Sequence, residues 1–552
     1  MTTASTKSDK KNAKNRTADE ARREYEIATS DGIPENAWRI GVIIIFVFAA
    51  ALRLYDLNLV PLHHDEGVNG NFLIRLVREG VYTYDPENYH GPTLYYFAAL
   101  IPWATKLLFG ASAREHYGLT TFTIRLVPAV FGLATIVLVL LLRKRLGTVT
   151  TLAAGMMLAV SPGAVYLSRY FIHETLFVFF TLGIVVAAVW FWDERNPSYL
   201  IPAAACAALL FATKETAMIS VGVLLIALAL TWVYTRFNQQ GSKKFVPKRY
   251  KEPTGLHSLL EQFGGTTSVV FNLVIAFIVF QGLYLLLYSS FLTNYKGIND
   301  SLQTFAVWSK TGRSAHVHPP FTYLAWLVKI EAPLLFLGAV GAAWAVLKPK
   351  NSLALFCGLW SFGLIAAYSL IPYKTPWLLL NFIVPLALIS GYTIQAIYDM
   401  DRRQLRLVVV IFLFAIGLGV YQSIDLNFIN YDNDDTKFVY VYAHTTRGML
   451  DLVNQVEQIS KDYEGGNTGI TIVSPDYWPL PWYFRNFSKV GYYGRMAPST
   501  EPLIIANENQ KQEVDANFGE VYRQVMSKEA GGTFELRPGV KLLLYVRRNR
   551  LQ

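Results

Sequence analysis

The chain contains few charged residues and almost no cysteine. Only 16% of its 552 residues are Asp, Glu, Lys or Arg, whereas 53% are hydrophobic. Apolar runs recur from about residue 38 to residue 425, a pattern that excludes an ordinary water-soluble fold and indicates a polytopic α-helical membrane protein. The two cysteines, Cys206 and Cys357, lie far apart in apolar runs, which argues against both a disulfide framework and a thiolate metal site.

The first 37 residues lack the apolar core of a cleavable signal peptide. They alternate Lys, Arg, Asp and Glu with almost nothing to bury, so we expect residues 1–37 to form a disordered cytoplasmic tail that precedes an uncleaved anchor. The net charge of +10 does not indicate a nucleic-acid partner. The basic residues gather instead in short loops between apolar runs, which is the positive-inside pattern of membrane proteins.

About eleven apolar segments are predicted to cross the bilayer, because most of them approach the ~20 residues that a helical span needs. These segments are residues 38–55, 122–142, 148–166, 175–192, 199–213, 217–235, 267–291, 319–346, 352–371, 375–397 and 407–425.

The apolar segment Thr93–Phe109 decides the topology, since it carries Pro102 and Lys106 and lies beside long polar stretches. If it lies in the membrane interface instead of crossing, every basic loop shares one side of the membrane with the N-terminal tail. Those loops contain residues 143–145, Arg195, residues 236–251, Lys348, Lys350 and residues 402–403. We therefore expect the tail inside the cell and interfacial helices in the first outer loop.

The composition changes to that of a water-soluble domain after the last apolar run. Residues 451–459 have a helical period, and residues 469–473, 502–505 and 541–546 resemble strands, which together predict a small α/β domain. The expected organisation is a transmembrane domain at 38–426 and an extracytoplasmic domain at 427–552. The aromatic stretch 477–485 could cover the mouth of an active site or bind sugar faces, but it would also suit the membrane interface.

The predicted topology places an ionisable cluster, residues 63–66, on the outer face just after the first span. Asp65 opens an amphipathic segment over residues 66–79, so it is expected to cap a helix that lies on the membrane. A helix N-terminus would also keep the carboxylate ionised, as a general base requires. We interpret Asp65 as that base and Glu66 as a second catalytic acid.

Four further clusters emerge on the same face. Glu174 brings a third acid, which we count with Asp65 and Glu66 as a catalytic residue. Arg169 would bind a phosphate or, alternatively, only form an ion pair with Glu174 that fixes the loop. Lys214 and Lys374 lie at bilayer depth, where an ammonium needs an anionic partner unless it snorkels as a simple anchor. The expected substrate-binding residues are His90, Arg169, Lys214, Tyr373 and Lys374.

An outer pocket with acids for an acceptor and cations for a phosphate suits the transfer of a group carried on a phospholipid. Because a polyprenyl phosphate is already stable as an anion, its departure needs little protonation. One base and a cationic clamp would suffice.

At these residues the chain resembles the GT-C class of polytopic glycosyltransferases, which include protein O-mannosyltransferases and the lipid A aminoarabinose transferase. The resemblance rests on Asp65 and Glu66 after the first span, on Arg-Leu-Val-Pro at residues 125–128, and on Ser-Pro followed by Arg169 and Glu174. A narrower similarity is to the archaeal and bacterial family named for an association with flippase activity in N-glycosylation. Its motifs are His-His-Asp-Glu-Gly at 63–67, His-Gly-Pro-Thr at 90–93, Thr-Lys-Glu-Thr at 213–216, Pro-Tyr-Lys-Thr-Pro-Trp at 372–377 and Trp-Tyr-Phe-Arg at 482–485.

The resemblance implies a polyprenyl-phosphate-linked monosaccharide as donor, an inverting transfer with Asp65 as base, and a lipid, glycan or protein as acceptor. The protein would be integral to the cytoplasmic membrane, with its active site and C-terminal domain on the extracytoplasmic face. The chain departs from the aminoarabinose transferase before the interfacial helix, where Glu-Lys-Pro-Pro is common and this chain has His-Gly-Pro-Thr at residues 90–93. Without that lysine, phosphate binding would fall to other residues such as Arg169, Lys214 or Lys374. Metal use varies within the class, so a divalent ion (Zn, Mg or Mn) held by His64, His90 and His173 stays open.

Two rival hypotheses come from other functional classes. A flippase for lipid-linked sugars should show polar residues along several spans or a transporter-like repeat, whereas the polar residues here concentrate at one membrane face. A non-catalytic scaffold of a glycosylation pathway would not depend on Asp65.

Overall fold

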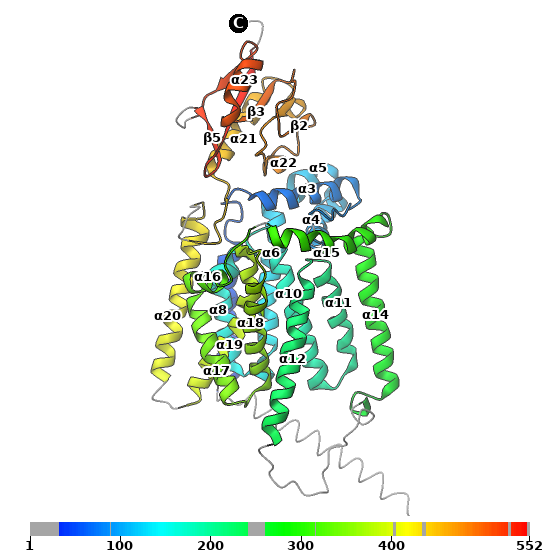
Figure 1. The fold of residues 1–552 in the computed structure, drawn as a ribbon, viewed down its shortest axis with the longest axis vertical. Coiled ribbons are helices and arrows are strands. Elements are labelled where there is room, and N and C mark those ends of the chain that lie inside the picture. The colour runs from blue at the N-terminus through cyan, green and yellow to red at the C-terminus, as the bar shows by residue number, and fades with distance from the viewer. Residues whose placement is uncertain are drawn as a thin grey trace, which may run out of the picture.

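The computed structural model describes residues 33–88, 90–240, 260–314, 316–400, 405–432, 438–527 and 532–548. A bundle of long helices carries a C-terminal sheet domain at one end (Figure 1). Most of the predicted tail, residues 1–32, lies outside the described residues. The first described helix, α2 (Glu35–Leu54), begins two residues before the predicted end of that tail.

Thirteen helices of the described residues build the bundle. They are α2, α6 (Thr121–Leu141), α8 (Thr148–Val160), α9 (Pro162–Ser168), α10 (Glu174–Glu194), α11 (Leu200–Phe211), α12 (Ala217–Gln240), α14 (Thr266–Tyr288), α16 (Thr322–Ile330), α17 (Ala332–Leu347), α18 (Ser352–Leu370), α19 (Leu380–Tyr398) and α20 (Leu405–Ile424).

Within the described residues, eight helices are long and apolar enough to cross a membrane, or ten if each of two bent pairs is one span. The bent pairs are α8 with α9, at 61°, and α16 with α17, at 112°. Each of the predicted spans coincides with one of these helices, with a bent pair, or with the shorter apolar helix Pro197–Phe211. The protein is therefore an integral, multi-pass membrane protein.

Three helices lie outside the bundle, at its end that faces the sheet domain (Figure 1). They are α3 (His64–Glu79), α4 (Thr93–Phe109) and α15 (Lys296–Ser314). The segment Thr93–Phe109 is not among the helices that could cross the membrane, in agreement with the predicted interfacial helix. Pro102 lies inside it.

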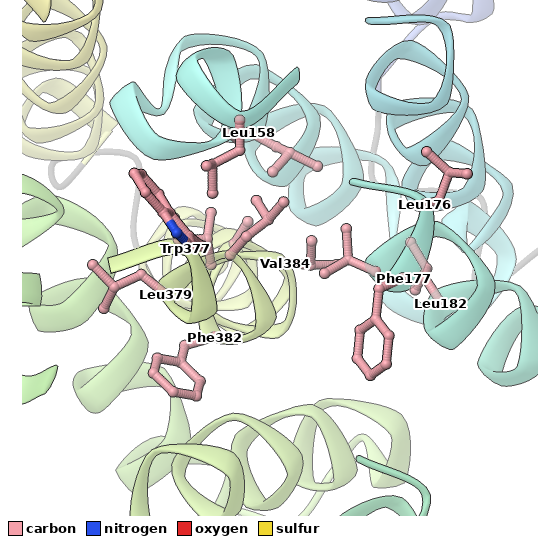
Figure 2. Packing of buried hydrophobic residues seen from close by; sticks show 14 of the residues in the cluster. Leu158, Leu176, Phe177, Leu182, Trp377, Leu379, Phe382 and Val384 are labelled. Carbon is pink, nitrogen blue, oxygen red and sulfur yellow. The ribbon is translucent and has the colours of Figure 1, made fainter. Parts of the chain in front are cut away.

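Helix α19 is the centre of the bundle. The segment Pro376–Tyr398 is buried along its whole apolar window, because it is apolar on every side and packs against α8, α10, α17 and α18. Figure 2 shows Trp377, Phe382 and Val384 of this region surrounded by side chains of neighbouring helices such as Leu158 and Phe177. The packing around α19 is thus mainly apolar.

Close approach of α19 to α8 depends on a glycine. A Cβ atom at Gly391 would lie 2.2 Å from the backbone oxygen of Thr150, and a small residue at this position lets the two backbones pack together, as is common between membrane helices.

The C-terminal domain is a six-stranded mixed sheet. Its strand order is β2 (Val490–Tyr492), β1 (Ile470–Ile472), β3 (Leu503–Asn507), β6 (Val540–Arg547) and β4 (Tyr522–Val525), with β5 (Phe534–Arg537) also paired to β6. Strand β1 is parallel to β2 and β3, whereas β6 is antiparallel to its partners. Helix α21 (Arg447–Ser460) packs on β5, and the short helices α22 (Leu480–Tyr483) and α23 (Lys511–Phe518) complete the domain.

The aromatic stretch of residues 477–485 joins this domain to helix α3. The Trp482 side chain is buried and packs so closely on the helix that a Cβ atom at Gly70 would lie 2.6 Å from its Cε3 atom. The hydroxyl of Tyr483 accepts a hydrogen bond from the Leu62 amide (2.9 Å), and Arg485 donates one to the carbonyl of Leu119 (2.8 Å). Most of the stretch is therefore a docking contact, a role that the sequence interpretation did not anticipate.

We predict that Gly391→Ala destabilises the bundle by about 1–3 kcal/mol, because the added methyl group must displace the α8 backbone. The matched control is Gly417→Ala in α20, where a Cβ atom would meet nothing within 4 Å. Thermal unfolding of the two variants in the same detergent measures the difference. Equal melting temperatures for both variants would contradict the proposed packing.

Candidate active site

A cavity of about 460 Å³ opens at the end of the bundle below the sheet domain. Its wall is formed by the start of α3, the loop before α4, the start of α10, and the loops that precede α12 and α19. The polar and aromatic side chains that line it include His63, His64, Asp65, Glu87, His90, His173, Glu174, Lys214, Glu215, Trp308, His316, Tyr373, Trp377, Tyr442 and Arg537. Most of the predicted site residues thus face one space.

Two short motifs pair through their backbones to build one side of the cavity. The amide of Gly91 donates to the carbonyl of Thr213 (3.0 Å), and the amide of Thr93 donates to that of Ala212 (3.2 Å). A Cβ atom at Gly91 would lie 2.1 Å from the Ala212 oxygen, so glycine is needed for this approach. The pairing brings His90 next to Lys214.

Lys214 and His90 connect two buried acids in this wall. The Lys214 Nζ atom donates to Glu174 at 2.7 Å, and the His90 Nδ1 atom lies 3.2 Å from Glu215. Burial alone would lower the pKa of Lys214, but the carboxylates of Glu174 and Glu215 outweigh it and raise that pKa. Burial opposes ionisation of Glu215, yet His90 and Lys214 hold its pKa below the ordinary value. Lys214 and Glu215 are therefore charged, and Glu174 is paired with Lys214, not with Arg169.

His173 lies beside this group in a fixed orientation. Its Nε2 atom donates to the carbonyl of Gly91 at 3.1 Å, and its ring centre is 4.9 Å from that of His90. Burial, together with the charges of His90 and Lys214, lowers the pKa of His173 well below its ordinary value. The ring is neutral at physiological pH.

The N-terminus of α3 places Asp65 in the cavity. The helix is capped by His63, whose Nδ1 atom accepts a hydrogen bond from the Asp65 amide at 3.1 Å. The prediction that Asp65 itself caps the helix is therefore wrong, because the backbone becomes helical one residue before it. Asp65 lies in the first turn with 45% of its side chain exposed, and its Oδ2 atom is 3.8 Å from His63 Nδ1.

Glu66 does not line the cavity, although it was expected to be catalytic. Its side chain is fully buried and accepts hydrogen bonds from Arg125 Nε (2.7 Å) and Nη2 (2.6 Å), from the His63 amide (3.0 Å) and from the Phe171 amide (2.8 Å). With both oxygens engaged by these donors, Glu66 is a structural anchor for the start of α3 and for the loop before α10.

Arg169 and Lys374 also differ from the expectation that they bind substrate. Arg169 donates to the carbonyls of Tyr55 (2.6 Å) and Asp56 (2.9 Å) just after α2. Lys374 donates to the carbonyls of Ser369 (3.2 Å) and Ile371 (2.5 Å) at the end of α18. Both cations satisfy backbone oxygens that the helix ends leave without partners, and neither lines the cavity.

Tyr373 reaches the cavity through a second backbone pairing. The amide of His318 donates to the carbonyl of Pro372 (3.1 Å), and the amide of Lys374 donates to that of His316 (3.0 Å). The pairing exposes the side chains of Tyr373 and His316 to the same space.

The predicted metal ligands do not form a site. Among the residues that the structure describes, no group of three or more His, Cys, Asp or Glu side chains is arranged to hold a metal ion. His90 is bound to Glu215 and His173 to a carbonyl, whereas His64 approaches the cavity from α3. The ammonium of Lys214 pairs with Glu174 and lies close enough to Glu215 to shift its pKa. This donor set does not fit a resident divalent ion.

The C-terminal domain also contributes to the cavity, which the sequence alone does not indicate. Arg537 of β5, which forms an ion pair with Asp476, lines it together with Tyr442. No local motif marks Arg537, because only the docking of the whole domain brings it to this position.

Some proteins of known structure share this architecture. The sequence profile of the dolichyl-phosphate-mannose-protein mannosyltransferase family matches residues 97–244. No curated protein sequence matches the chain at a significant level. ArnT from Cupriavidus metallidurans, solved with bound undecaprenyl phosphate, is similar with a TM-score of 0.60 and 13% identity over 91% of this chain and 97% of ArnT.

A second solved structure is the oligosaccharyltransferase AglB from Archaeoglobus fulgidus, in complex with an inhibitory peptide and a dolichol-phosphate. It has a TM-score of 0.51 and 12% identity over 86% of this chain and 70% of AglB. The Archaeoglobus fulgidus oligosaccharyltransferase in complex with Zn and sulfate has a TM-score of 0.50 and 13% identity, covering 85% and 68% of the two chains. The chain has the GT-C fold.

In this GT-C protein we predict that Lys214→Met costs about 3–5 kcal/mol of stability, because it leaves Glu174 and Glu215 buried without their cation. Adding Glu174→Gln to that variant should recover part of the loss, since one uncompensated charge is removed. Unfolding of the wild type, both single variants and the double variant measures this coupling. Simple additivity of the two single effects would contradict the charge network.

Proposed function

We propose that this protein is a membrane glycosyltransferase that moves a sugar from a polyprenyl-phosphate carrier to an acceptor in the cavity beneath the sheet domain. The GT-C fold supports this proposal, as does the match of residues 97–244 to a family of dolichyl-phosphate-mannose-dependent enzymes. Two of the similar solved structures contain undecaprenyl phosphate or dolichol-phosphate. A lipid, a glycan or a protein would be the acceptor.

The main support for the proposal is the exposure and position of the Asp65 carboxylate. Glu174 and Glu215, which line the same cavity, are engaged by Lys214 and His90. The Asp65 carboxylate instead is half exposed to the cavity and is held on the first turn of helix α3. An accessible carboxylate in a fixed position is suited to take a proton from an acceptor hydroxyl.

The chemistry needs little more than this base. The acceptor oxygen attacks the anomeric carbon while the bond from that carbon to the phosphate oxygen breaks, and Asp65 takes the hydroxyl proton. Attack opposite the leaving phosphate inverts the anomeric centre. The phosphate leaves as a stable anion without an acid catalyst, and the cations that line the cavity, Lys214 and Arg537, are paired with Glu174 and Asp476. No step passes through a metal ion, because the residues present do not fit one.

We further propose that the cavity and the sheet domain lie on the extracytoplasmic face of the cytoplasmic membrane. The basic loop at residues 143–145 and the start of α2 share the opposite end of the bundle, since Arg143 forms an ion pair with Glu35 (2.9 Å). Asn351 donates to the Arg145 carbonyl there (2.7 Å), beside Lys348 and Lys350. Basic loops favour the cytoplasmic side. The predicted basic residues 402–403 and 241–251 lie outside the described residues.

A flippase is less consistent with this architecture. Transport of a sugar headgroup needs polar groups along the spans, but the central helix α19 is surrounded by apolar side chains (Figure 2). The ionisable residues that line the cavity gather at one end of the bundle.

We predict that Asp65→Asn lowers the rate of sugar transfer about 10²- to 10⁴-fold, the range that general bases usually contribute. The measurement is mass spectrometry of lipid-linked sugar and product in proteoliposomes that contain a polyprenyl-phosphate hexose and membrane acceptors. Glu79→Gln is the matched control, because this exposed acid lies at the other end of α3 and its loss should leave the rate unchanged.

Equal transfer by the wild type and Asp65→Asn would remove Asp65 as the base. Movement of sugar lipids across the bilayer by both proteins, without a new product, would favour the flippase instead.

A further inference from the structure

Three aromatic side chains, His316, Tyr373 and Tyr442, gather on one wall of the cavity. The ring centre of His316 lies 5.5 Å from that of Tyr373 and 6.0 Å from that of Tyr442, with interplanar angles of 86° and 74°. These are edge-to-face contacts of the kind that aromatic rings prefer. We call the three residues the aromatic wall.

The aromatic wall is held by three separate segments of the chain. His316 belongs to the loop between α15 and α16, and Tyr373 to the loop between α18 and α19. The backbones of these two loops pair with each other. Tyr442 belongs to the segment between α20 and the sheet domain, where its carbonyl oxygen lies 2.9 Å from the Nε2 atom of His63. The rings are therefore fixed by backbone contacts.

Two of these segments contain unusual backbone conformations. His316 has a φ of 46°, and Ala443, which follows Tyr442, has a φ of 49°. Residues other than glycine rarely adopt this left-handed region, and such residues are common at ligand-binding sites. Ala443 also lines the cavity.

Membrane anchoring does not account for these rings. Tyr and Trp are common where membrane helices meet water, but there they lie at the level of the lipid headgroups, whereas the aromatic wall lines the same cavity as Asp65. Core packing would bury the rings, yet Tyr442 is 45% exposed and His316 is exposed as well. The wall thus offers ring surface to a ligand.

A sugar ring suits this surface. The faces of a pyranose carry C–H bonds, which pack on an aromatic ring through apolar and weak C–H contacts, whereas its hydroxyl groups project from the edge and need polar partners. Glu87 and Arg537 line the same cavity. The Arg537 guanidinium has five N–H donors, more than its ion pair with Asp476 engages.

We propose that the acceptor is a carbohydrate, one pyranose face of which packs on the aromatic wall while one of its hydroxyl groups meets Asp65. This inference rests on the proposed function and names the class of its acceptor. The wall adjoins the base, because the residue that contacts the Tyr442 carbonyl is His63, two positions before Asp65.

The same position favours the acceptor over the sugar of the donor. Tyr442 leads into the sheet domain, which lies beyond the end of the bundle (Figure 1). A water-soluble acceptor reaches the cavity from this side, whereas the lipid chain of the donor must stay along the apolar helices.

The step balances in atoms and charge. The hydroxyl oxygen of the acceptor bonds to the anomeric carbon, and the bond from that carbon to the carrier phosphate breaks with its electron pair on the phosphate oxygen. The phosphodiester, with one negative charge, becomes a monoester with two, and the hydroxyl proton passes to Asp65. The product is a glycan that is longer by one sugar.

A peptide acceptor fits the wall less well. Extended peptides are often bound through the backbone amides and carbonyls of a strand edge. In this cavity the loop of His316 uses such groups to pair with the loop of Tyr373. The surface that these loops present is therefore made by side chains.

The first experiment measures binding by saturation-transfer difference NMR. The full-length protein in lipid nanodiscs is mixed with the methyl pyranosides of glucose, galactose and mannose as probes. We expect saturation transfer from the wild type to the ring protons of at least one probe. Mannitol is the control ligand and should receive none, because it has the hydroxyl groups but no ring face.

Substitutions in the aromatic wall test the stacking directly. Tyr442→Leu and Tyr373→Leu remove a ring and should weaken binding of the probe about 3- to 10-fold. Tyr442→Phe and Tyr373→Phe keep the ring and should bind as the wild type does. The control is Tyr493→Leu, which removes an exposed tyrosine of the sheet domain that does not line the cavity.

The second experiment measures transfer in proteoliposomes that contain a polyprenyl-phosphate hexose. The wild type should glycosylate the bound methyl pyranoside in preference to a peptide with Ser, Thr and Asn or to a phospholipid. The two Leu variants should raise the KM for the pyranoside about 3- to 10-fold and leave the KM for the donor unchanged. The two Phe variants should restore the wild-type KM.

Absence of saturation transfer to every probe, or equal binding by the wild type and both Leu variants, would overturn the proposal. Displacement of the pyranoside by the donor would overturn it as well, because the rings would then hold the donor sugar. So would transfer to the peptide or the phospholipid but to no pyranoside. Failure of the proposed function differs from all of these, since the pyranoside would bind the aromatic wall but the wild type would transfer sugar to no acceptor.

Discussion

The contact between Glu66 and Arg125 determines where the candidate site can form. A fully buried carboxylate is costly unless donors surround it, and Glu66 receives two hydrogen bonds from Arg125 and one each from the amides of His63 and Phe171. Arg125 also donates to the carbonyls of Leu57 and Val60, both at 2.8 Å. One ion pair thus ties α6 to the end of α2, the start of α3 and the loop before α10. Because Asp65 adjoins Glu66, its place in the cavity follows from this contact.

The remaining wall is made by loops that pair with each other at the same end of the bundle. The motif at residues 90–93 aligns with the motif at 213–216, and residues 316–318 align with 372–374. These backbone contacts satisfy polar groups that could not be exposed to lipid. They also place Lys214 where it neutralises Glu174. The apolar helix α19 fills the interior, and the ionisable residues that line the cavity lie at one end of the bundle.

The sequence predicts the spanning segments well, because a run of apolar residues near the length of a bilayer has few alternatives. It also identifies Asp65, His90, Lys214 and Tyr373, which line the cavity. It does not separate these residues from Glu66, Arg169 and Lys374, since a buried ion pair and a helix-end contact use the same residue types as a phosphate site. The cap at His63 and the contribution of Arg537 depend on backbone geometry and on domain docking, which no local pattern reveals.

The central claim is that the headgroup of a sugar-bearing lipid binds in the cavity between Asp65 and Lys214. The most direct measurement is a cryo-EM structure of the full-length protein with a polyprenyl phosphonate sugar, in which a carbon atom replaces the bridging oxygen to prevent transfer. The account predicts that the anomeric carbon lies in the cavity, with room for one acceptor oxygen between it and the Asp65 carboxylate. A headgroup bound at the opposite end of the bundle, or outside this cavity, would contradict it.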